Sequence, residues 1–380
     1  MTEKSAISVL FIGHTYLTRI SQKKLKALQE IGCRVGVLVP SNWRDRGPLL
    51  RGIHFQPQRL EGITLYSAPV IRSGHIASHL YVPGVISSLI HSFKPDIVQV
   101  EQEIYSYASA QAALAGKVSG KKVIVFGWEN LDRRLHITQI LCRALTLRIA
   151  DGIICGNSEG AKLVQLLGYK KHLEVIPQLG IDPQEFSPVT HYREKQFCIG
   201  FVGRLVREKG VDILLRAIHC LAQKATCSDL RLVLVGSGPE KENLSSLAHT
   251  LQIADKIDFF DTIPHEDVPK MISKISVLVL PSRSTAYWKE QFGHVLIEAM
   301  SMGIPVIGSE SGAIPEVIGR QDVLFPEDDV SKLSLLLERV MQDQNWYREL
   351  SQYGRNRVIH NYTNTVIAHR LLQLYHSIKT

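Results

Sequence analysis

Two glutamates flank the expected start of a helix in the second half of the chain. Glu290 and Glu298 belong to the stretch EQFGHVLIE, which follows a strand-like run ending at Leu280. The first amides of a helix carry partial positive charge and could hold a phosphate, which Gly293 would let approach closely. The amides concerned are those of Phe292, Gly293, His294 and Val295.

Each glutamate could then bind a different part of a ligand that carries such a phosphate. Glu298 lies four residues beyond His294, on the same helical face and one turn deeper, where it could accept hydrogen bonds from a ribose. Glu290 lies in the loop before the helix and could contact a sugar on the other side. If the two glutamates are taken alone, the alternative is that they bind no ligand, one being an ordinary acidic residue in the first turn of a helix and the other a solvated glutamate.

A second cluster of charge lies at the end of an earlier strand-like run. In FVGRLVREKG, residues 201–210, the run ends at Gly203, and Arg204 and Lys209 flank a turn into a helix. A guanidinium and an ammonium at the same strand end could together neutralise a diphosphate. A solvated turn is the alternative. The similar turn at Gly236 lacks the third glycine of a dinucleotide-binding fingerprint.

The elements that must position these residues follow one alternating pattern. Apolar runs of strand length alternate with helical patterns in both halves of the chain. The strand-like runs are VLFIG, VGVLVP, PDIVQV, VIVFG and GIIC in the first half, and FCIGFVG, LRLVLVG, IDFF, SVLVLP and PVIGSE in the second. Such alternation is typical of parallel, doubly wound sheets, whose ligands bind at the carboxyl ends of the strands. Residues 43–69 interrupt it and are predicted to form a mobile loop or a small hairpin insertion.

We therefore predict an α/β protein with two Rossmann-like domains that face each other across a cleft. A chain of 380 residues is long for a single core. The Pro- and Gly-containing stretch LEVIPQLGIDPQEFSP is the expected linker. The predicted domains are 1–185 on the acceptor side and 186–355 for the donor, with a helix at 356–380 returning to the first domain.

Composition excludes several classes of protein. Hydrophobic residues make up 45% and charged residues 21% of the chain, as in ordinary globular proteins. The six Cys show no C-x-x-C spacing, which favours reduced thiols in a cytoplasmic protein. No run reaches the length of about 18 apolar residues that a membrane-spanning helix requires. Basic clusters interleaved with aromatic residues are absent, so nucleic acid is not an expected partner.

The excess positive charge lies in the first half. Residues 1–185 contain 22 Lys and Arg against 14 Asp and Glu, a net charge of +8, and the remaining residues are balanced. The basic residues singled out are Arg19, Lys23, Lys24 and Lys26 in one helix, and Arg44, Arg46, Arg51 and Arg59 in the irregular insertion. Such a surface suggests docking on anionic lipid, peripherally at the inner face of a membrane, or binding of an acidic acceptor. A solvated helix face is the alternative.

The ordered set of motifs resembles the retaining glycosyltransferases of family 4, which have the GT-B fold. The resemblance covers roughly residues 173–326 and rests on VIPQLGID, FVGRLVREKG, LVGSGPE and the E-x7-E of EQFGHVLIEAMSMGIPVIGSESGAIPEVI. It implies that Arg204 and Lys209 hold the donor diphosphate, that Glu298 binds the ribose and that Glu290 contacts the donor sugar. It also implies that main chain near Gly293, His294 and Val295 holds phosphate or sugar hydroxyls, and that Thr262 and Ile263 line the base.

The resemblance further implies the reaction. A hexose would pass from a UDP- or GDP-sugar to an acceptor hydroxyl with retention of configuration, in glycolipid, lipopolysaccharide or exopolysaccharide assembly. The expected mechanism is front-face attack without a metal ion or other cofactor, and the donor loop contains no D-x-D. A small soluble glycoside as product, or a non-catalytic protein that binds nucleotide sugars, are the alternatives.

The first half departs from the pattern of the family. Relatives often carry a Gly-Gly loop after the first strand, where this chain has Gly13 and His14, and they commonly show His at the ends of two later strands. This chain has Glu101, Gln102 and Glu103 after PDIVQV, and Glu129 after VIVFG. We expect Glu129 to replace the missing histidine at a donor hydroxyl or the acceptor, and His14 to contact a phosphate or the acceptor. Structural roles are the alternative for both.

Overall fold

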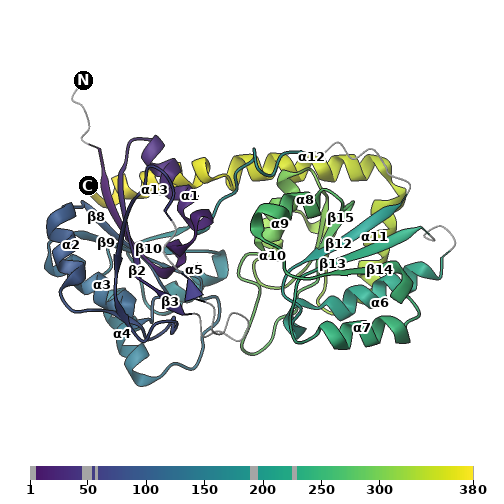
Figure 1. The fold of residues 1–380 in the computed structure, drawn as a ribbon, viewed down its shortest axis with the longest axis horizontal. Helices are drawn as coiled ribbons and strands as arrows, with labels where there is room; N and C mark the ends of the chain where they lie inside the picture. The colour runs from purple at the N-terminus through teal and green to yellow at the C-terminus, as the bar shows by residue number, and fades with distance from the viewer. Residues whose placement is uncertain (1–5, 45–53, 56–58, 189–195, 225–228, 380) are drawn as a thin grey trace. The chain divides into compact units, whose positions relative to one another are not determined.

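The computed structural model describes residues 6–44, 54–55, 59–188, 196–224 and 229–379 (Figure 1). The described chain divides into two compact units. Unit 1 comprises Met1–Gly180 and Asn364–Thr380, and unit 2 comprises Ile181–Thr363. The sequence-based boundaries were 185 and 355. The switch at 363 lies where the helix α12 (Gln344–Asn361) ends and α13 (Asn364–Lys379) begins.

Unit 1 is built on a parallel sheet with the strand order β11-β10-β9-β8-β1-β2-β5. The strands are β1 (Ser8–Ile12), β2 (Arg34–Pro40), β5 (Thr64–Ala68), β8 (Ile97–Glu101), β9 (Lys122–Gly127), β10 (Gly152–Cys155) and β11 (His172–Val175). Their near-continuous apolar sequences are explained by apolar cores on both faces of the sheet. The predicted parallel sheet is thus confirmed for this half of the chain.

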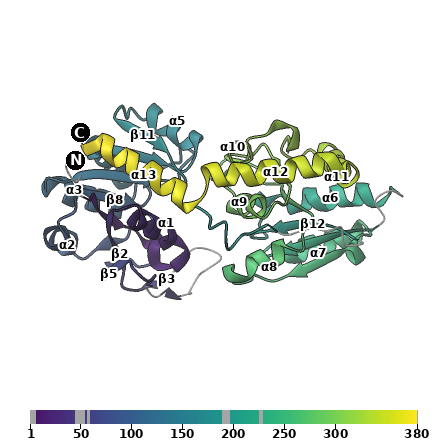
Figure 2. The same cartoon turned by 90° about the horizontal axis from the view of Figure 1, so that it is seen from above.

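Helices cover both faces of this sheet. The core on one face includes side chains of α1 (Arg19–Glu30) and α13, which Figure 2 shows lying beside each other. The core on the other face includes side chains of α2 (Val85–Phe93), α3 (Tyr107–Val118) and α5 (Ser158–Leu166). The helix α4 (Ile137–Ile149) packs against α3.

The irregular insertion contains more regular structure than a loop or hairpin. Within it, β3 (Trp43–Arg44) and β4 (His54–Phe55) form an antiparallel pair, and directly after it β6 (Val70–Ile71) and β7 (Leu80–Tyr81) form another. Between β4 and β6 in the sequence, β5 pairs in parallel with β2 and forms the edge strand of the main sheet. Its residues are mostly half-buried or exposed, so no continuous apolar run marked it in the sequence. Arg46 and Arg51 lie outside the described residues.

Unit 2 repeats the architecture with the strand order β14-β13-β12-β15-β16-β17, again in parallel. Its strands are β12 (Phe197–Val202), β13 (Leu230–Val235), β14 (Ile257–Phe260), β15 (Val277–Leu280), β16 (Val306–Ser309) and β17 (Leu324–Phe325). Its helices are α6 (Val211–Ala222), α7 (Lys241–Thr250), α8 (Val268–Ile272), α9 (His294–Ser301), α10 (Ile314–Ile318), α11 (Val330–Gln342) and α12. α11 packs against α6, and α12 packs against α9. Within the described residues, no helix combines the length and apolar character needed to cross a membrane.

A buried ion pair ties α1 to the central sheet of unit 1. Lys24 is only 2% exposed and donates from Nζ to Glu101 Oε1 at 2.6 Å. Gln99 and Gln178 also donate to this carboxylate, at 2.8 and 2.9 Å. The Tyr375 hydroxyl of α13 donates to Gln99 Oε1 at 2.6 Å, which extends the network to the C-terminal helix. Lys24 therefore does not belong to a basic outer face of α1, as the sequence had suggested, and Glu101 has a structural partner.

Breaking this pair from one side should destabilise unit 1. Glu101→Gln leaves the Lys24 ammonium buried without a counter-charge, so we expect a loss of about 3 kcal/mol or more in the free energy of unfolding. The double variant Lys24→Met/Glu101→Gln removes both charges, so its free energy of unfolding should fall by less than that of the single variant. Urea titration followed by circular dichroism measures both. A loss below about 1 kcal/mol in the single variant would contradict the pairing.

Candidate active site

The carboxyl ends of neighbouring strands bring the predicted residues of unit 2 together. β12 lies between β13 and β15, and all three run in parallel. The segments that follow them therefore emerge at one edge of the sheet. Gly203 follows β12 and Gly236 follows β13, and a Cβ on Gly236 would lie 1.9 Å from the carbonyl oxygen of Gly203. These two backbones can approach so closely only because position 236 carries no side chain.

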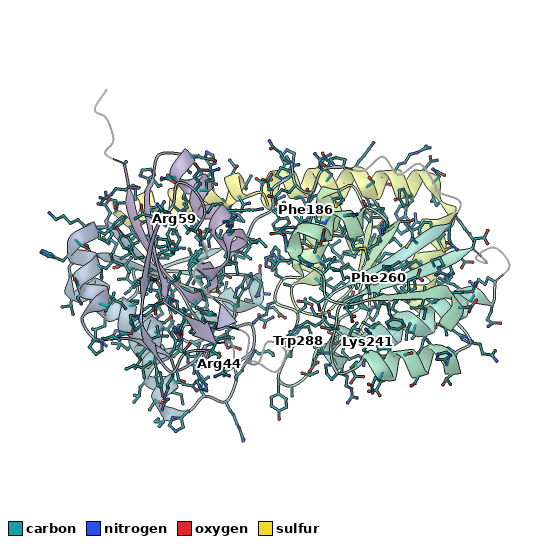
Figure 3. The ribbon with its side chains drawn as sticks, in the orientation of Figure 1. Arg44, Arg59, Phe186, Lys241, Phe260 and Trp288 are labelled. Carbon is teal, nitrogen blue, oxygen red and sulfur yellow. The ribbon has the colours of Figure 1, made fainter. Side chains whose placement is uncertain are left out.

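The two residues assigned to the diphosphate and the sugar form an ion pair with each other. Lys209 ends the short helix η2 (Arg207–Lys209) and donates from Nζ to Glu290 Oε2 at 2.5 Å. Ser282, just after β15, donates to the same oxygen at 2.9 Å. Lys209 also lies over the ring of Trp288, whose position in the loop before Glu290 is labelled in Figure 3. The side chains of Lys209 and Glu290 remain 13% and 8% exposed, so the pair is not sealed from solvent.

The other predicted glutamate meets a histidine. Glu298 lies on α9 and its Oε1 is 3.1 Å from Nε2 of His265, in the short helix η5 (His265–Asp267). The ring of Phe186 contacts the His265 ring edge to face at 5.6 Å between centroids. The sequence did not indicate a contact between His265 and Glu298. This contact with the ribose candidate joins two segments that lie 33 positions apart in the sequence.

The N-terminus of α9 has the geometry expected for holding an anion. Gly293 is the N-cap residue with φ of 79°, a left-handed conformation that favours glycine. The N-terminus of a helix carries partial positive charge, so the backbone at His294 and Val295 suits an anionic ligand. Burial lowers the pKa of the His294 side chain, against the opposing charges of Glu298 and Glu290. The uncharged ring packs against Phe292 at 4.8 Å between centroids.

The remaining predicted residues of unit 2 lie nearby on the neighbouring strand ends. Arg204 is exposed and forms no ion pair with any residue that the structure describes. Thr262 follows β14, and its Oγ1 is 2.7 Å from Ser237 Oγ in the turn after β13. Ile263 is partly buried against the small apolar cluster that contains Val235. These residues surround the strand ends without a contact that defines a base-binding role.

In unit 1, His14 belongs to a cluster of rings that the sequence did not indicate. Gly13 and His14 follow β1, and His14 Nδ1 is 2.9 Å from Gln102 Oε1. The His14 ring stacks on Trp43 at 4.7 Å, and His79 lies edge-on to Trp43 at 4.8 Å. Burial and the neighbouring His79 lower the pKa of His14 to about 4, which makes it uncharged at neutral pH. An uncharged imidazole suits a hydroxyl better than a phosphate.

The carboxylates after β8 and β9 form a second group in unit 1. Glu129 accepts a hydrogen bond from Arg133 Nε at 2.5 Å, and burial raises its pKa despite this cation. Burial and the charge of Glu129 raise the pKa of Glu103 to about 7. Oε2 of Glu103 is buried and has no hydrogen-bond partner among the described residues. The charge of Glu129 thus acts on Glu103, whereas Glu101 is paired with Lys24.

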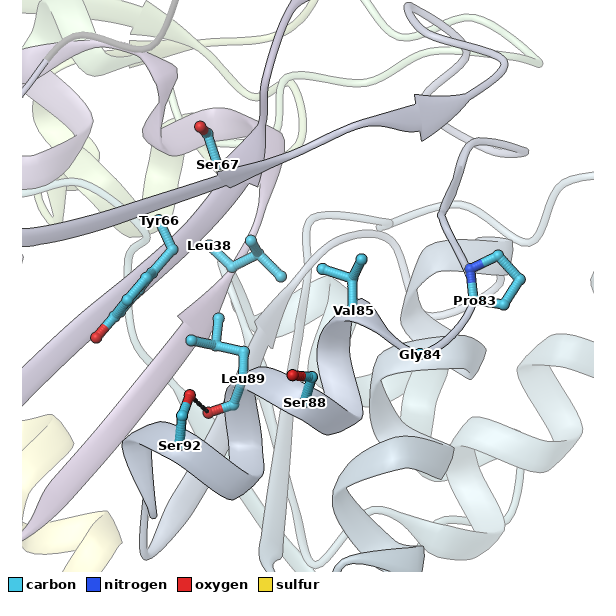
Figure 4. Close-up of a pocket in the computed structure, with 9 residues that line it drawn as sticks. All are labelled: Leu38, Tyr66, Ser67, Pro83, Gly84, Val85, Ser88, Leu89 and Ser92. Atoms are coloured by element: carbon cyan, nitrogen blue, oxygen red, sulfur yellow. Dashed lines mark hydrogen bonds between the residues drawn. The ribbon is translucent and has the colours of Figure 1, made fainter.

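Two cavities in unit 1 differ in what they could bind. A cavity of about 20 Å³ beside Tyr105, Glu129 and Arg133 has room for about one water molecule. A larger groove of about 470 Å³ opens between β2, β5 and α2 (Figure 4). Its described lining residues include Tyr66 and Leu89 but none of the predicted site residues. The larger groove is therefore not the candidate site.

Within the described part of the chain, no group of three or more His, Cys, Asp or Glu side chains could hold a metal ion. Glu327, which precedes α11, instead accepts hydrogen bonds from the Ser284 amide and hydroxyl at 2.8 and 2.5 Å.

Comparisons with known proteins place this site in context. Residues 182–357 match the sequence model of the family described as Glycosyl transferases group 1. The amylovoran biosynthesis glycosyltransferase AmsK of Erwinia amylovora is 26% identical over 298 residues, which cover 76% of this chain and 72% of that protein. A GDP-mannose-dependent alpha-(1-6)-phosphatidylinositol monomannoside mannosyltransferase of Mycolicibacterium smegmatis is 27% identical over 227 residues, 56% of this chain and 59% of that protein.

A solved structure extends the similarity to the whole chain. HepE of Anabaena, in complex with UDP, superimposes with a TM-score of 0.73 at 14% identity, over 98% of this chain and 100% of that one. Similarity at this level of identity shows the fold, which is GT-B as predicted. Residues 182–357, which contain Lys209, Glu290 and Glu298, therefore match the glycosyl transferases group 1 model, and the chain has the GT-B fold.

Proposed function

We propose that the protein is a retaining glycosyltransferase that transfers a hexose from a UDP- or GDP-sugar to an acceptor hydroxyl. The observation that carries this proposal is the Lys209–Glu290 pair at the strand ends beside the N-terminus of α9. A cation, a carboxylate and the positive end of a helix are the groups that a nucleoside-diphosphate sugar needs. An acceptor in exopolysaccharide or glycolipid assembly is proposed, because AmsK is named for amylovoran biosynthesis and the Mycolicibacterium enzyme for a phosphatidylinositol monomannoside.

The assigned roles follow the charges that change during transfer. As the anomeric bond breaks, negative charge grows on the leaving diphosphate, which Lys209, Arg204 and the first amides of α9 would stabilise. Glu298 would accept from the ribose hydroxyls, and Glu290 would accept from a hydroxyl of the donor sugar. The departing phosphate oxygen would take the proton of the acceptor hydroxyl. The acceptor oxygen would at the same time attack the anomeric carbon from the face that the phosphate leaves. This mechanism requires no metal ion or other cofactor.

Binding of the donor would change the partners of Lys209. Its ammonium now donates to Glu290 at 2.5 Å, and a diphosphate would offer it a second acceptor of higher charge. Ser282 donates to the same Glu290 oxygen, so the carboxylate keeps one partner if the lysine turns toward the phosphate. The pair would in this way keep both groups ordered before the donor arrives.

The acceptor groups are proposed in unit 1. His14, uncharged and stacked on Trp43, is suited to contact an acceptor hydroxyl, and Glu129 remains the candidate to replace the histidine of relatives. Glu103 joins Glu129 in this assignment because its buried Oε2 has no hydrogen-bond partner among the described residues. Peripheral attachment to an anionic membrane is also proposed.

Thermal shift against UDP-, GDP- and ADP-sugars, followed by mass detection of donor turnover, tests the proposed function. We expect one nucleotide series to raise the melting temperature and one member to be hydrolysed slowly without acceptor. Stabilisation without turnover, with or without lysate acceptors, would favour a non-catalytic binding protein. Transfer only to small soluble acceptors would favour the soluble glycoside alternative.

Substitution of the ion pair should abolish transfer. Glu290→Gln keeps an acceptor for Ser282 but removes the charge, and Lys209→Ala removes the diphosphate contact. We expect donor turnover to fall at least about 100-fold in each, since preorganised charges of this kind contribute that much. Lys224→Ala, which breaks an ion pair with Glu338 on α11 of the same unit, is the matched control and should keep full activity. Wild-type turnover by folded Glu290→Gln or Lys209→Ala would refute the assignment.

The raised pKa of Glu103 predicts a pH-dependent stability. A carboxyl group that titrates near 7 when folded and near 4.5 when unfolded binds more protons in the folded state between these values. The free energy of unfolding therefore falls as pH rises through this window, by about 3 kcal/mol at most. Glu103→Gln should match the wild type at pH 4, below both values, and be more stable than it above pH 7. Urea titrations at both pH values measure the difference.

Glu61→Gln is the control for this pH effect, because Glu61 is exposed on the same unit. It should show no gain in stability at high pH. Equal stability of Glu103→Gln and the wild type above neutral pH would mean that the Glu103 carboxylate is not held in an apolar surrounding.

A further inference from the structure

Helix α4 exposes apolar side chains on one face, although its Leu147 and Ile149 pack against the core of unit 1. All of its residues, Ile137–Ile149, are described, and Thr146 is the one that is classed as buried. The side chains of Ile137 and Leu141 are instead 60% and 62% exposed. A globular helix normally turns such residues to the core and its polar ones to solvent. The inner face of α4 packs against α3, so the exposed face is the one without a neighbouring helix among the described residues.

The exposed apolar residues form a continuous stripe. Ile137, Ile140, Leu141 and Ala144 are exposed at positions i, i+3, i+4 and i+7. This spacing places them within about 100° of one helical face. Two more exposed apolar side chains, Leu114 and Val118, lie one turn apart on α3, which Figure 1 shows beside α4. A single exposed leucine needs no explanation, but a stripe over two turns of one helix does.

Cations flank the stripe at both ends of α4. Arg134 is exposed just before the helix, and Arg148 is exposed in its last turn, where Lys171 Nζ donates to the Arg148 carbonyl oxygen at 2.8 Å. From the start of α3 to the end of α4, residues 107–149 contain 7 Lys and Arg against 2 Asp and Glu, and 7 − 2 gives a net charge of +5. Most of the excess charge of the first half thus lies in and around these two helices.

We propose that the exposed face of α4 docks on an anionic lipid bilayer, with the helix lying in the plane of the interface. Exposed Ile and Leu side chains would enter the acyl boundary while Arg134 and Arg148 contact lipid phosphates. A second copy of the chain fits less well, because it would bring the same cations against each other. An anionic surface supplies the opposite charge over the whole patch.

This surface differs from the one that the sequence suggested. The basic helix α1 was the expected docking element, but Lys24 is buried against Glu101 and α1 packs on α13. Lys23 and Lys26 remain on α1 as half-buried and exposed cations without an exposed apolar stripe. The proposal is independent of the transfer reaction, because it concerns vesicle binding and requires no turnover.

Flotation of the full chain with vesicles tests the proposal. We expect binding to phosphatidylcholine mixed with phosphatidylglycerol, weaker binding to phosphatidylcholine alone, and a loss of binding as salt is raised. Ile137→Ser/Leu141→Ser should lower the partition coefficient about tenfold or more on the anionic vesicles. Arg134→Gln/Arg148→Gln should lower it at least about tenfold on these vesicles and leave the weak binding to neutral vesicles unchanged.

Matched variants on unit 2 control for changes in general surface character. Leu335→Ser removes an equally exposed leucine from α11, and Arg216→Gln/Arg348→Gln removes two exposed arginines from α6 and α12. Both should bind vesicles like the wild type. Donor hydrolysis, measured in solution, should be unchanged in all of these variants, which separates a failure of docking from a failure of the proposed transfer.

Three outcomes would overturn the proposal. The first is a wild-type chain that does not bind anionic vesicles at low salt. The second is unchanged binding by Ile137→Ser/Leu141→Ser together with a loss in Lys23→Gln/Lys26→Gln, which would assign docking to α1. The third is a dimer in sedimentation velocity that Ile137→Ser/Leu141→Ser dissociates, without vesicle binding, which would make the stripe an interface between copies.

Discussion

The candidate site depends on the ion pair between Lys209 and Glu290. Two charged groups at the edge of a sheet lose much of their hydration, and each is tolerated there because the other compensates its charge. The pair also fixes the loop after β15 against the turn after β12, because Ser282 donates to the same carboxylate oxygen. A donor diphosphate would therefore meet an ordered cation rather than a mobile one, which lowers the entropic cost of binding.

A second lysine–glutamate pair in unit 1 has nearly the same geometry and a different consequence. Lys24 and Glu101 are 2.6 Å apart, but their side chains are 2% and 0% exposed, against 13% and 8% for Lys209 and Glu290. Three further side chains, Gln99, Gln178 and Tyr375, complete the hydrogen-bond network around Lys24 and Glu101. No ligand can reach a pair enclosed in this way, so its effect is to fasten α1 and α13 to the sheet. Accessibility, not residue type, separates the two roles.

The fold could be predicted from the sequence because buried parallel strands are continuous apolar runs, and both sheets consist mainly of such strands. β5 could not, since an edge strand that is half-exposed leaves no run. For the candidate site, Glu290 and Glu298 could be proposed from the sequence because their spacing around one helix start is local, and their roles stay predictions. The contacts of His265 and the rings around His14 could not, since they join segments far apart in the sequence.

The sequence also does not show which charged side chains reach the surface of the folded protein. The sequence places a net charge of +8 in residues 1–185, but a sum does not say which side chains reach the surface. Folding removes Lys24 from the surface and pairs Arg133 with Glu129 and Arg143 with Asp132. Arg134 and Arg148 remain exposed at the two ends of α4, beside apolar side chains that no described element covers. Cations that frame an apolar stripe make hydrophobic and electrostatic attraction act at one place, and an anionic bilayer is the surface that satisfies both.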